Sequence, residues 1–343
     1  MERRGAVVCS FVLLLAALAN AGTFREQRAG FRQEINLKAE EPMDKEGLFH
    51  SVTFKNEKEW NFQVSPEERE ELKAKIKNFF DLKKTELLDP MVNEMSKGRF
   101  IVYKEYSPES EGVNLKCAFL SPKVPYWKYL TDIAGIEKLF YVYNFSVELG
   151  KKSPDDTYVL LQTQGRYMGF RKAVTLPLLF HADQPSRTLS FSEAGQKEIT
   201  DVVESLPVRN PGRTSLNDRF LDLCRSYAWF QDKDAAGKYL VSDIQILELL
   251  DQAIIDKDKK CDVYASDGGW KIDENLSDNY LFVTYTLKTA VNLRAFIPPN
   301  IPLLGPMFKR IAQSISGEVS AKYLPLSMKN FRDLTGQWAK EAE

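Results

Sequence analysis

The sequence predicts an α+β domain in which a large antiparallel sheet is flanked and interrupted by helices. Several segments alternate apolar and polar residues and are separated by glycine- or proline-containing turn signals. A capped helical pattern precedes these segments, and a long apolar stripe with helical spacing follows them. A stretch at about 196–262 has helical instead of strand patterning, so we expect a helical insertion within the sheet sequence.

The first helix is predicted to begin at the segment SPEERE. Ser65 is a suitable N-cap, Pro66 suits the first helical position, and Glu68 completes a capping box. Apolar residues then recur at helical spacing, at Leu72, Ile76, Phe79 and Leu87. Pro90 is expected to end or kink this helix because proline lacks the backbone N–H.

The strands are predicted from their alternation. They fall at 99–106, 113–120, 139–149, 157–163, 166–176, 187–193 and 279–289. One face of 113–120 carries Val113, Leu115, Cys117 and Phe119. One face of 139–149 carries Leu139, Tyr141, Tyr143, Phe145, Val147 and Leu149. One face of 279–289 carries Leu281, Val283, Tyr285 and Leu287. Gly165, Pro185 and the GGW segment at 268–270 are interpreted as turns.

The segment after the last strand is apolar and rich in proline. AFIPPNIPLLGPMF occupies 295–308 and holds four prolines. A helical stripe follows, formed by Leu304, Phe308, Ile311, Ile315 and Val319 and broken at Pro325. The main domain is predicted to span 65–343, preceded by a leader and docking segment at 22–64.

The first 21 residues have the features of a signal peptide. Arg3 and Arg4 precede an apolar run, and Ala19-Asn20-Ala21 fits a small-x-small cleavage site. The apolar run is short for a membrane span, which needs about 20 residues. We therefore expect export, with a membrane anchor as the alternative. The formal net charge is −1 without charged blocks, so nucleic acid is not predicted as a partner.

Export permits a disulfide among the remaining cysteines. We predict a pair between Cys224 and Cys261, which flank one helical region, and a buried thiol at Cys117. Three free thiols are the alternative. There is no CxxC pair and only two histidines, His50 and His181, so no metal and no cofactor is predicted.

Two stretches carry a resemblance to a known family. VNLKCAFLSPKVPYWKYLTDIAGIEKLFYVYNFSVEL at 113–149 resembles a strand, a proline-flanked helix ending in LTD, and the next strand of the START-like superfamily, also called SRPBCC or polyketide-cyclase/dehydrase-like. GGWKI and the segment 281–311 are similar to that family's last strand, proline loop and closing helix. The resemblance implies a helix-grip fold, in which a curved sheet wraps around a long C-terminal helix and encloses a cavity for lipids, sterols, isoprenoids or polyketides.

The candidate site follows from placing the sequence in such a fold. The predicted cavity residues are Tyr141, Tyr143, Phe145, Tyr285, Phe308 and Ile311. Arg166 and Arg171 are candidates for contact with a ligand headgroup. Phe296, Ile297, Ile301 and Leu303 are candidates for transient membrane contact at the cavity mouth. As alternatives, the aromatics form an ordinary core, the arginines are solvated, and the loop packs under the insertion.

No catalytic motif is present: the chain has no GxSxG, P-loop, GxGxxG or HExxH. We therefore predict no catalytic residue and a binding role, in which an exported protein holds a hydrophobic small molecule and transfers it to or from membranes. Two alternatives stay open. A cyclase or dehydratase would direct His181, Arg166 or Asp132 into the cavity, and an interaction protein would use the insertion. Asn144 and Asn275 begin glycosylation sequons.

Overall fold

The computed structural model describes most of the chain between residues 37 and 336. The described residues are 37–54, 60–106, 112–132, 143–167, 170–206, 212, 215–225, 263–291, 324–329, 331–333 and 336. Within these ranges, no helix is both long enough and apolar enough to cross a bilayer.

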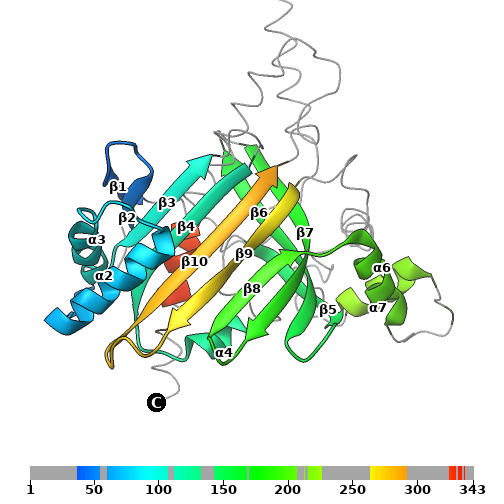
Figure 1. The fold of residues 1–343 in the computed structure, drawn as a ribbon. Helices are drawn as coiled ribbons and strands as arrows, with labels where there is room; N and C mark the ends of the chain where they lie inside the picture. Colours follow the sequence, from blue (N-terminus) through cyan, green and yellow to red (C-terminus); the bar gives the residue numbers. More distant parts are fainter. Residues whose placement is uncertain are drawn as a thin grey trace, which may run out of the picture.

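A single antiparallel sheet dominates the fold (Figure 1). Its strands are β1 (Leu37–Pro42), β2 (Phe49–Phe54), β3 (Phe100–Tyr106), β4 (Gly112–Pro122), β5 (Tyr143–Lys151), β6 (Asp156–Tyr167), β7 (Phe170–Asp183), β8 (Thr188–Glu193), β9 (Val263–Asp273) and β10 (Tyr280–Val291). The spatial order is β1-β2-β3-β4-β10-β9-β8-β7-β6-β5, so β10 returns from the end of the chain to pair with β4. The predicted antiparallel sheet is therefore confirmed.

Helices lie at both ends of the sheet. They are α2 (Pro66–Phe80), α3 (Leu88–Ser96), α4 (Tyr126–Leu130), α6 (Gln196–Ser205) and α7 (Leu216–Arg225). Figure 1 shows α2 and α3 at the β2–β4 end, and α6 and α7 at the β5–β7 end. We call the face covered by these four helices the outer face. The opposite face, which carries residues 324–331, is called the inner face.

The start of α2 agrees with the prediction. Ser65 Oγ accepts a hydrogen bond from the Glu68 N–H at 3.2 Å, and Glu68 accepts one from the Ser65 N–H at 2.8 Å. The helix ends earlier than predicted, at Asp81, whose φ of 56° reverses the chain. The Leu82 N–H then bonds to the Lys77 carbonyl at 3.0 Å and closes the last turn.

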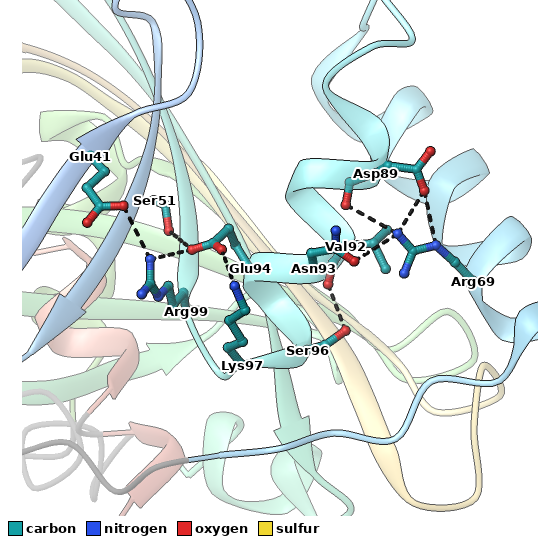
Figure 2. A network of polar contacts seen from close by, with 10 residues as sticks. All are labelled: Glu41, Ser51, Arg69, Asp89, Val92, Asn93, Glu94, Ser96, Lys97 and Arg99. Atoms are coloured by element: carbon teal, nitrogen blue, oxygen red, sulfur yellow. Dashed lines mark hydrogen bonds and ion pairs between the residues drawn. The ribbon is translucent and has the colours of Figure 1, made fainter.

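The proposed role of Pro90 as a helix breaker is wrong. Pro90 lies in the first turn of α3, where its missing N–H has no intrahelical partner to lose. Buried apolar side chains on both helices, including Leu72 and Met91, pack on the outer face of β3, β4 and β10. Cross-helix contacts join the pair, because Arg69 of α2 bonds to Asp89 and Asn93 of α3 (Figure 2).

β1 and β2 extend the sheet into the segment that the sequence assigned to a docking leader. β2 pairs with β3 through Phe49–Tyr103 and the following positions, and β1 pairs with β2. Trp60 packs closely on Gly98, whose φ of 78° forms the turn between α3 and β3. The sheet therefore begins well before residue 65.

The GGW segment at 268–270 is part of β9, not a turn. A side chain at Gly268 would clash with the Thr286 carbonyl and the Phe191 ring, because the neighbouring strands approach closely there. Such close approach is typical of strand glycines at a bend. Gly165 likewise lies within β6, whereas Pro185 does lie in the β7–β8 turn.

The C-terminal helix is described only in part. Residues 324–329, 331–333 and 336 are helical. The long helix expected before them lies outside the described residues and stays a prediction.

Candidate functional site

The inner face of the sheet is apolar across most of its width. Its buried side chains come from β2–β4 and β6–β10 and include Val102, Leu115, Val159, Leu178 and Val283. The alternation predicted for two of these strands is confirmed, since Val113, Leu115, Cys117, Phe119, Leu281, Val283 and Tyr285 all belong to this cluster. The buried members of this cluster are at most 8% exposed, so the inner face is an apolar layer shielded from water.

A row of aromatic rings crosses the inner face. The successive rings are Phe180, Phe191, Tyr285, Trp270, Phe331 and Tyr126, with centroid distances of 5.8, 6.3, 4.6, 5.4 and 4.4 Å. The row joins β7 and β8 to the C-terminal segment and α4. Tyr285, a predicted cavity residue, lies in the middle of this row and is only 4% exposed.

Arg332 fixes the C-terminal segment to one end of this face. The side chain is fully buried, and its Nη1 donates to the Gly98 carbonyl at 2.9 Å and the Leu120 carbonyl at 3.3 Å. Its guanidinium lies over the Phe100 ring at 4.4 Å and the Trp60 ring at 5.3 Å. Planar stacking and bonds to backbone carbonyls offset the cost of burying this cation.

Arg332 is not among the site residues predicted from the sequence. The residue stands within FRDL in an apolar-spaced helical segment, where an arginine usually points to solvent. Its carbonyl partners lie 234 and 212 positions away, so no local pattern indicates them.

Cys117 is the buried thiol that the sequence predicted. Burial raises the pKa of this thiol, and the nearby positive charge of Arg332 only partly opposes the shift. The thiol is therefore protonated near neutral pH, and an inert packing role is expected.

The described part of β5 keeps its expected alternation, but its apolar side chains face outward instead of inward. Val147 and Leu149, which the sequence placed on the face of the predicted cavity aromatics, pack outward with Ile199 and Val203 of α6. Ser146 of β5 pairs with Leu161 of the inner face. The reason is that β5 carries two register shifts and that α6 offers a second apolar surface on the outside.

Several predicted site residues lie outside the described residues. They are Tyr141, Phe308, Ile311, Phe296, Ile297, Ile301, Leu303 and Cys261. The backbones of Tyr143, Phe145, Arg166, Arg171 and Cys224 are described as parts of strands or a helix, but their side chains are not. Cavity, headgroup, membrane and disulfide roles for these residues stay predictions.

His181 faces away from the predicted cavity. Its neighbours along β7, Phe180 and Ala182, belong to the inner face, so the alternation of the strand directs His181 outward. The side chain is 53% exposed, and its Nδ1 lies 2.8 Å from Asp156 Oδ1. Hydrogen bonds from Ser153 and His181 lower the pKa of Asp156. Asp155 and Asp156 thus lie at the bend that joins β5 to β6.

A polar group occupies the β1–β3 margin of the inner face. Glu40, His50 and Lys104 come from adjacent strands and share the side of Val52 and Val102. Glu40 Oε1 lies 3.9 Å from His50 Nε2 and 3.4 Å from Lys104 Nζ. The sequence analysis missed this group because it placed residues 22–64 outside the domain. The alternation of His50, Val52 and Phe54 was the available signal.

Within the described part of the chain, no set of three or more metal-binding side chains could hold an ion.

The comparisons with known proteins concern structure alone. No family model matches the chain, and no curated protein matches it. Human STARD10 is similar at 10% identity, over 71% of this chain and 72% of that one, with a TM-score of 0.40. The Zhui aromatase/cyclase from Streptomyces sp. R1128 is similar at 10% identity, over 68% and 96%, with a TM-score of 0.39.

A STAR-related lipid transfer protein from Xanthomonas axonopodis is similar at 12% identity, over 69% of this chain and 93% of that one, with a TM-score of 0.35. The solved structures similar to this chain thus include a protein named for lipid transfer and an aromatase/cyclase. Identities and TM-scores this low concern the overall fold, and they carry no information on ligand or chemistry.

Proposed function

We propose that this protein is an exported carrier that holds a hydrophobic small molecule against the inner face of the sheet and transfers it to or from membranes. The observation that carries the proposal is the inner face itself, which is apolar from β2 to β6 and bears described helical residues near one end. The ligand would lie along the rest of this face, beside Tyr285 and the predicted cavity residues Tyr141, Tyr143, Phe145, Phe308 and Ile311.

The energy for such binding comes from burial. A chain of a dozen methylenes at about 0.8 kcal/mol each contributes on the order of 10 kcal/mol before the costs of association. Little polar recognition is required for a ligand of this kind, so the absence of a catalytic motif from the sequence is compatible with the proposal.

The residues that the sequence named for the catalytic alternative have less support. It expected His181, Arg166 or Asp132 in the cavity, and His181 faces outward with more than half of its side chain exposed. Asp132 is exposed, and the side chain of Arg166 is not described. For the interaction alternative, the described part of the insertion, α6 and α7, packs on the outer face.

The first test is to purify the mature protein, extract it with organic solvent, and record native mass spectra. We expect a co-purifying hydrophobic molecule, or uptake of an apolar fluorescent probe by the extracted protein. If neither is observed, the proposal is wrong.

Two leucines of β7 form a matched pair that assigns the binding face. Leu176 lies on the inner side and Leu179 on the outer side, and both are half-buried. Leu176→Gln should weaken probe binding several-fold through lost apolar contact, on the order of 1 kcal/mol. Leu179→Gln should leave affinity unchanged, with melting temperatures recorded for both variants.

Membrane transfer is tested at the proline-rich loop. Phe296→Asp combined with Phe308→Asp should weaken association with liposomes and leave the melting temperature unchanged, because the loop would present apolar side chains to the bilayer. Unchanged association would remove the membrane role. Export is tested by N-terminal sequencing of the secreted protein, which should begin at Gly22.

A further inference from the structure

The Glu40, His50 and Lys104 group has a geometry that a purely structural role does not explain. Its three side chains come from three neighbouring strands, β1, β2 and β3. Glu40 pairs in register with Val52, and His50 pairs with Val102, so the group stands directly beside buried apolar residues of the inner face.

His50 is the most deeply placed of the three. It is 9% exposed, and its Nδ1 atom is buried without a hydrogen-bond partner among the residues that the structure describes. Buried polar side-chain atoms are nearly always hydrogen-bonded, so a buried ring nitrogen without a partner indicates a missing polar group. An apolar ligand with a polar end could supply that group.

The charges of the group indicate what kind of polar end it accepts. The Lys104 ammonium and the Glu40 carboxylate face each other at 3.4 Å and balance. Burial and the Lys104 charge lower the pKa of His50, while Glu40 and Asp44 oppose the shift, so the imidazole is neutral near pH 7. No unpaired positive charge is left in this group to attract an anionic headgroup.

The position of the group also suits an elongated ligand. Lys104 lies four residues along β3 from Phe100, over whose ring the Arg332 guanidinium lies. At about 3.3 Å per residue, roughly 13 Å separates the two positions. The strip between them on the inner face is lined by Phe100, Val102, Leu115 and Cys117.

We propose that His50 Nδ1 is the hydrogen-bonding anchor for the uncharged hydroxyl or carbonyl end of an amphiphilic ligand, whose tail lies on the inner face. Glu40 and Lys104 hold the imidazole at the margin of that face. The inference rests on the proposed carrier function and adds to it the class of ligand, a neutral amphiphile instead of a fatty acid or a phosphate-bearing lipid.

The experiment compares three fluorescent probes. Each is a dodecyl chain with pyrene at one end and a methyl, hydroxyl or carboxylate group at the other. The wild-type protein should bind the alcohol roughly threefold to tenfold more tightly than the hydrocarbon, the range expected for one net hydrogen bond. The measured quantity is the ratio of the two dissociation constants, which a general loss of folding does not change selectively.

Variants of His50 test the assigned nitrogen atom. His50→Phe should bring the ratio close to one. His50→Asn places an amide near the Nδ1 position and should restore most of the alcohol preference, whereas His50→Gln places its amide near Nε2 and should not. His181→Gln is the matched control, since that histidine is exposed on the outer side.

The outcomes separate the two proposals. If the wild type binds all probes but His50→Phe leaves the ratio unchanged, or if the carboxylate probe binds best, the anchor is wrong and the carrier function stands. If the wild type binds none of the probes and yields no extractable ligand, the carrier function is wrong and the anchor is lost with it.

Discussion

Two helical pairs cover the outer face of the sheet, and they do so in different ways. The first cover, α2 and α3, packs on β2–β4 and β10. The second cover, α6 and α7, packs on β5 and β6. Both bury an apolar stripe of a helix against an apolar strand surface, so the difference lies in how much is buried and how the helices are joined to the sheet.

The first cover combines deep packing with polar contacts to several elements. Leu72, Ile76, Met91, Val92 and Met95 are fully buried. Besides the Arg69–Asp89 contact between its helices, Glu94 of α3 accepts a hydrogen bond from Ser51 of β2 at 2.9 Å and contacts Arg99 (Figure 2). Lys75 of α2 reaches Asp273 of β9.

The second cover has a smaller core and fewer described polar contacts. Ile199 and Val203 of α6 and Phe220 of α7 form its centre. Among the described residues, Glu198 of this cover accepts a hydrogen bond from Tyr158 at 3.2 Å and faces Lys152 at 3.3 Å. Within the part of the chain that the structure describes, the first cover buries more apolar side chains than the second, so local opening is expected first at β5 and β6.

The largest effect is expected from a matched isoleucine truncation. Ile76→Ala and Ile199→Ala remove the same atoms from fully buried positions in the two covers. Core truncations cost about 2–5 kcal/mol, with larger values where the surroundings cannot collapse. We expect Ile76→Ala near the upper end and Ile199→Ala near the lower end, measured by equilibrium urea unfolding. Equal losses would contradict the comparison.

An intermediate effect is expected from Glu94→Gln. Burial raises the pKa of Glu94, but hydrogen bonds from Lys97 and Ser51 and the charge of Arg99 outweigh it, so the folded pKa lies below the usual 4.5. Its stabilisation is complete above pH 4.5 and is lost as the pH falls through the lower folded value. Glu94→Gln should lower the free energy of unfolding by about 1–2 kcal/mol at pH 7. It should also make the decrease of this free energy at acid pH shallower.

The matched change in the second cover is Glu198→Gln. The Gly195 N–H and then Lys152 lower the pKa of Glu198, so the sign of its pH dependence is the same. Its side chain is 43% exposed, against 17% for Glu94, and solvent screening should make its effect smaller. If Glu198→Gln changes the pH dependence of the free energy of unfolding more than Glu94→Gln does, the second cover is the more firmly held of the two.

The smallest effects are expected at the helix starts. Ser65 provides both halves of a capping box, whereas Gly195 has no side chain and only donates its N–H to Glu198 at 3.0 Å. Ser65→Ala should therefore cost about 1 kcal/mol, and Gly195→Ser should gain a few tenths. A serine Cβ at Gly195 would make only ordinary contacts, the nearest at 3.5 Å to Glu198. Thermal unfolding of both variants measures these two effects. If Gly195→Ser is less stable than the wild-type protein, the lack of a side-chain cap does not weaken the start of α6.

Sequence patterns predicted those parts of the fold whose physical cause is local. The alternation of β4 and β10 and the cap of α2 each depend on residues within a few positions of one another, and the structure confirms them. The end of α2 was not predicted because Asp81 adopts a left-handed conformation in which glycine or asparagine is the usual signal.

The features that sequence patterns missed depend on distant neighbours. The outward packing of Val147 requires α6, and the strand position of Gly268 requires the close approach of β8 and β10. His50 was not considered for the site because β1 and β2 are short and their pairing with β3 is set by tertiary structure. The sequence therefore predicted the part of the candidate site at Tyr285 and β10. It did not predict the group of Glu40, His50 and Lys104 at the margin of the inner face.

The bond between Arg332 and Gly98 has a consequence for the rate of folding. It joins residues 234 positions apart, and the neighbouring β4–β10 pairing is similarly remote in sequence. Contacts of such high sequence separation require the entropy of closing a long loop before any stabilisation is gained. The contacts of the inner face should consequently form late and slowly. Until they form, the apolar side of the incomplete sheet is exposed, which favours aggregation or binding by a chaperone.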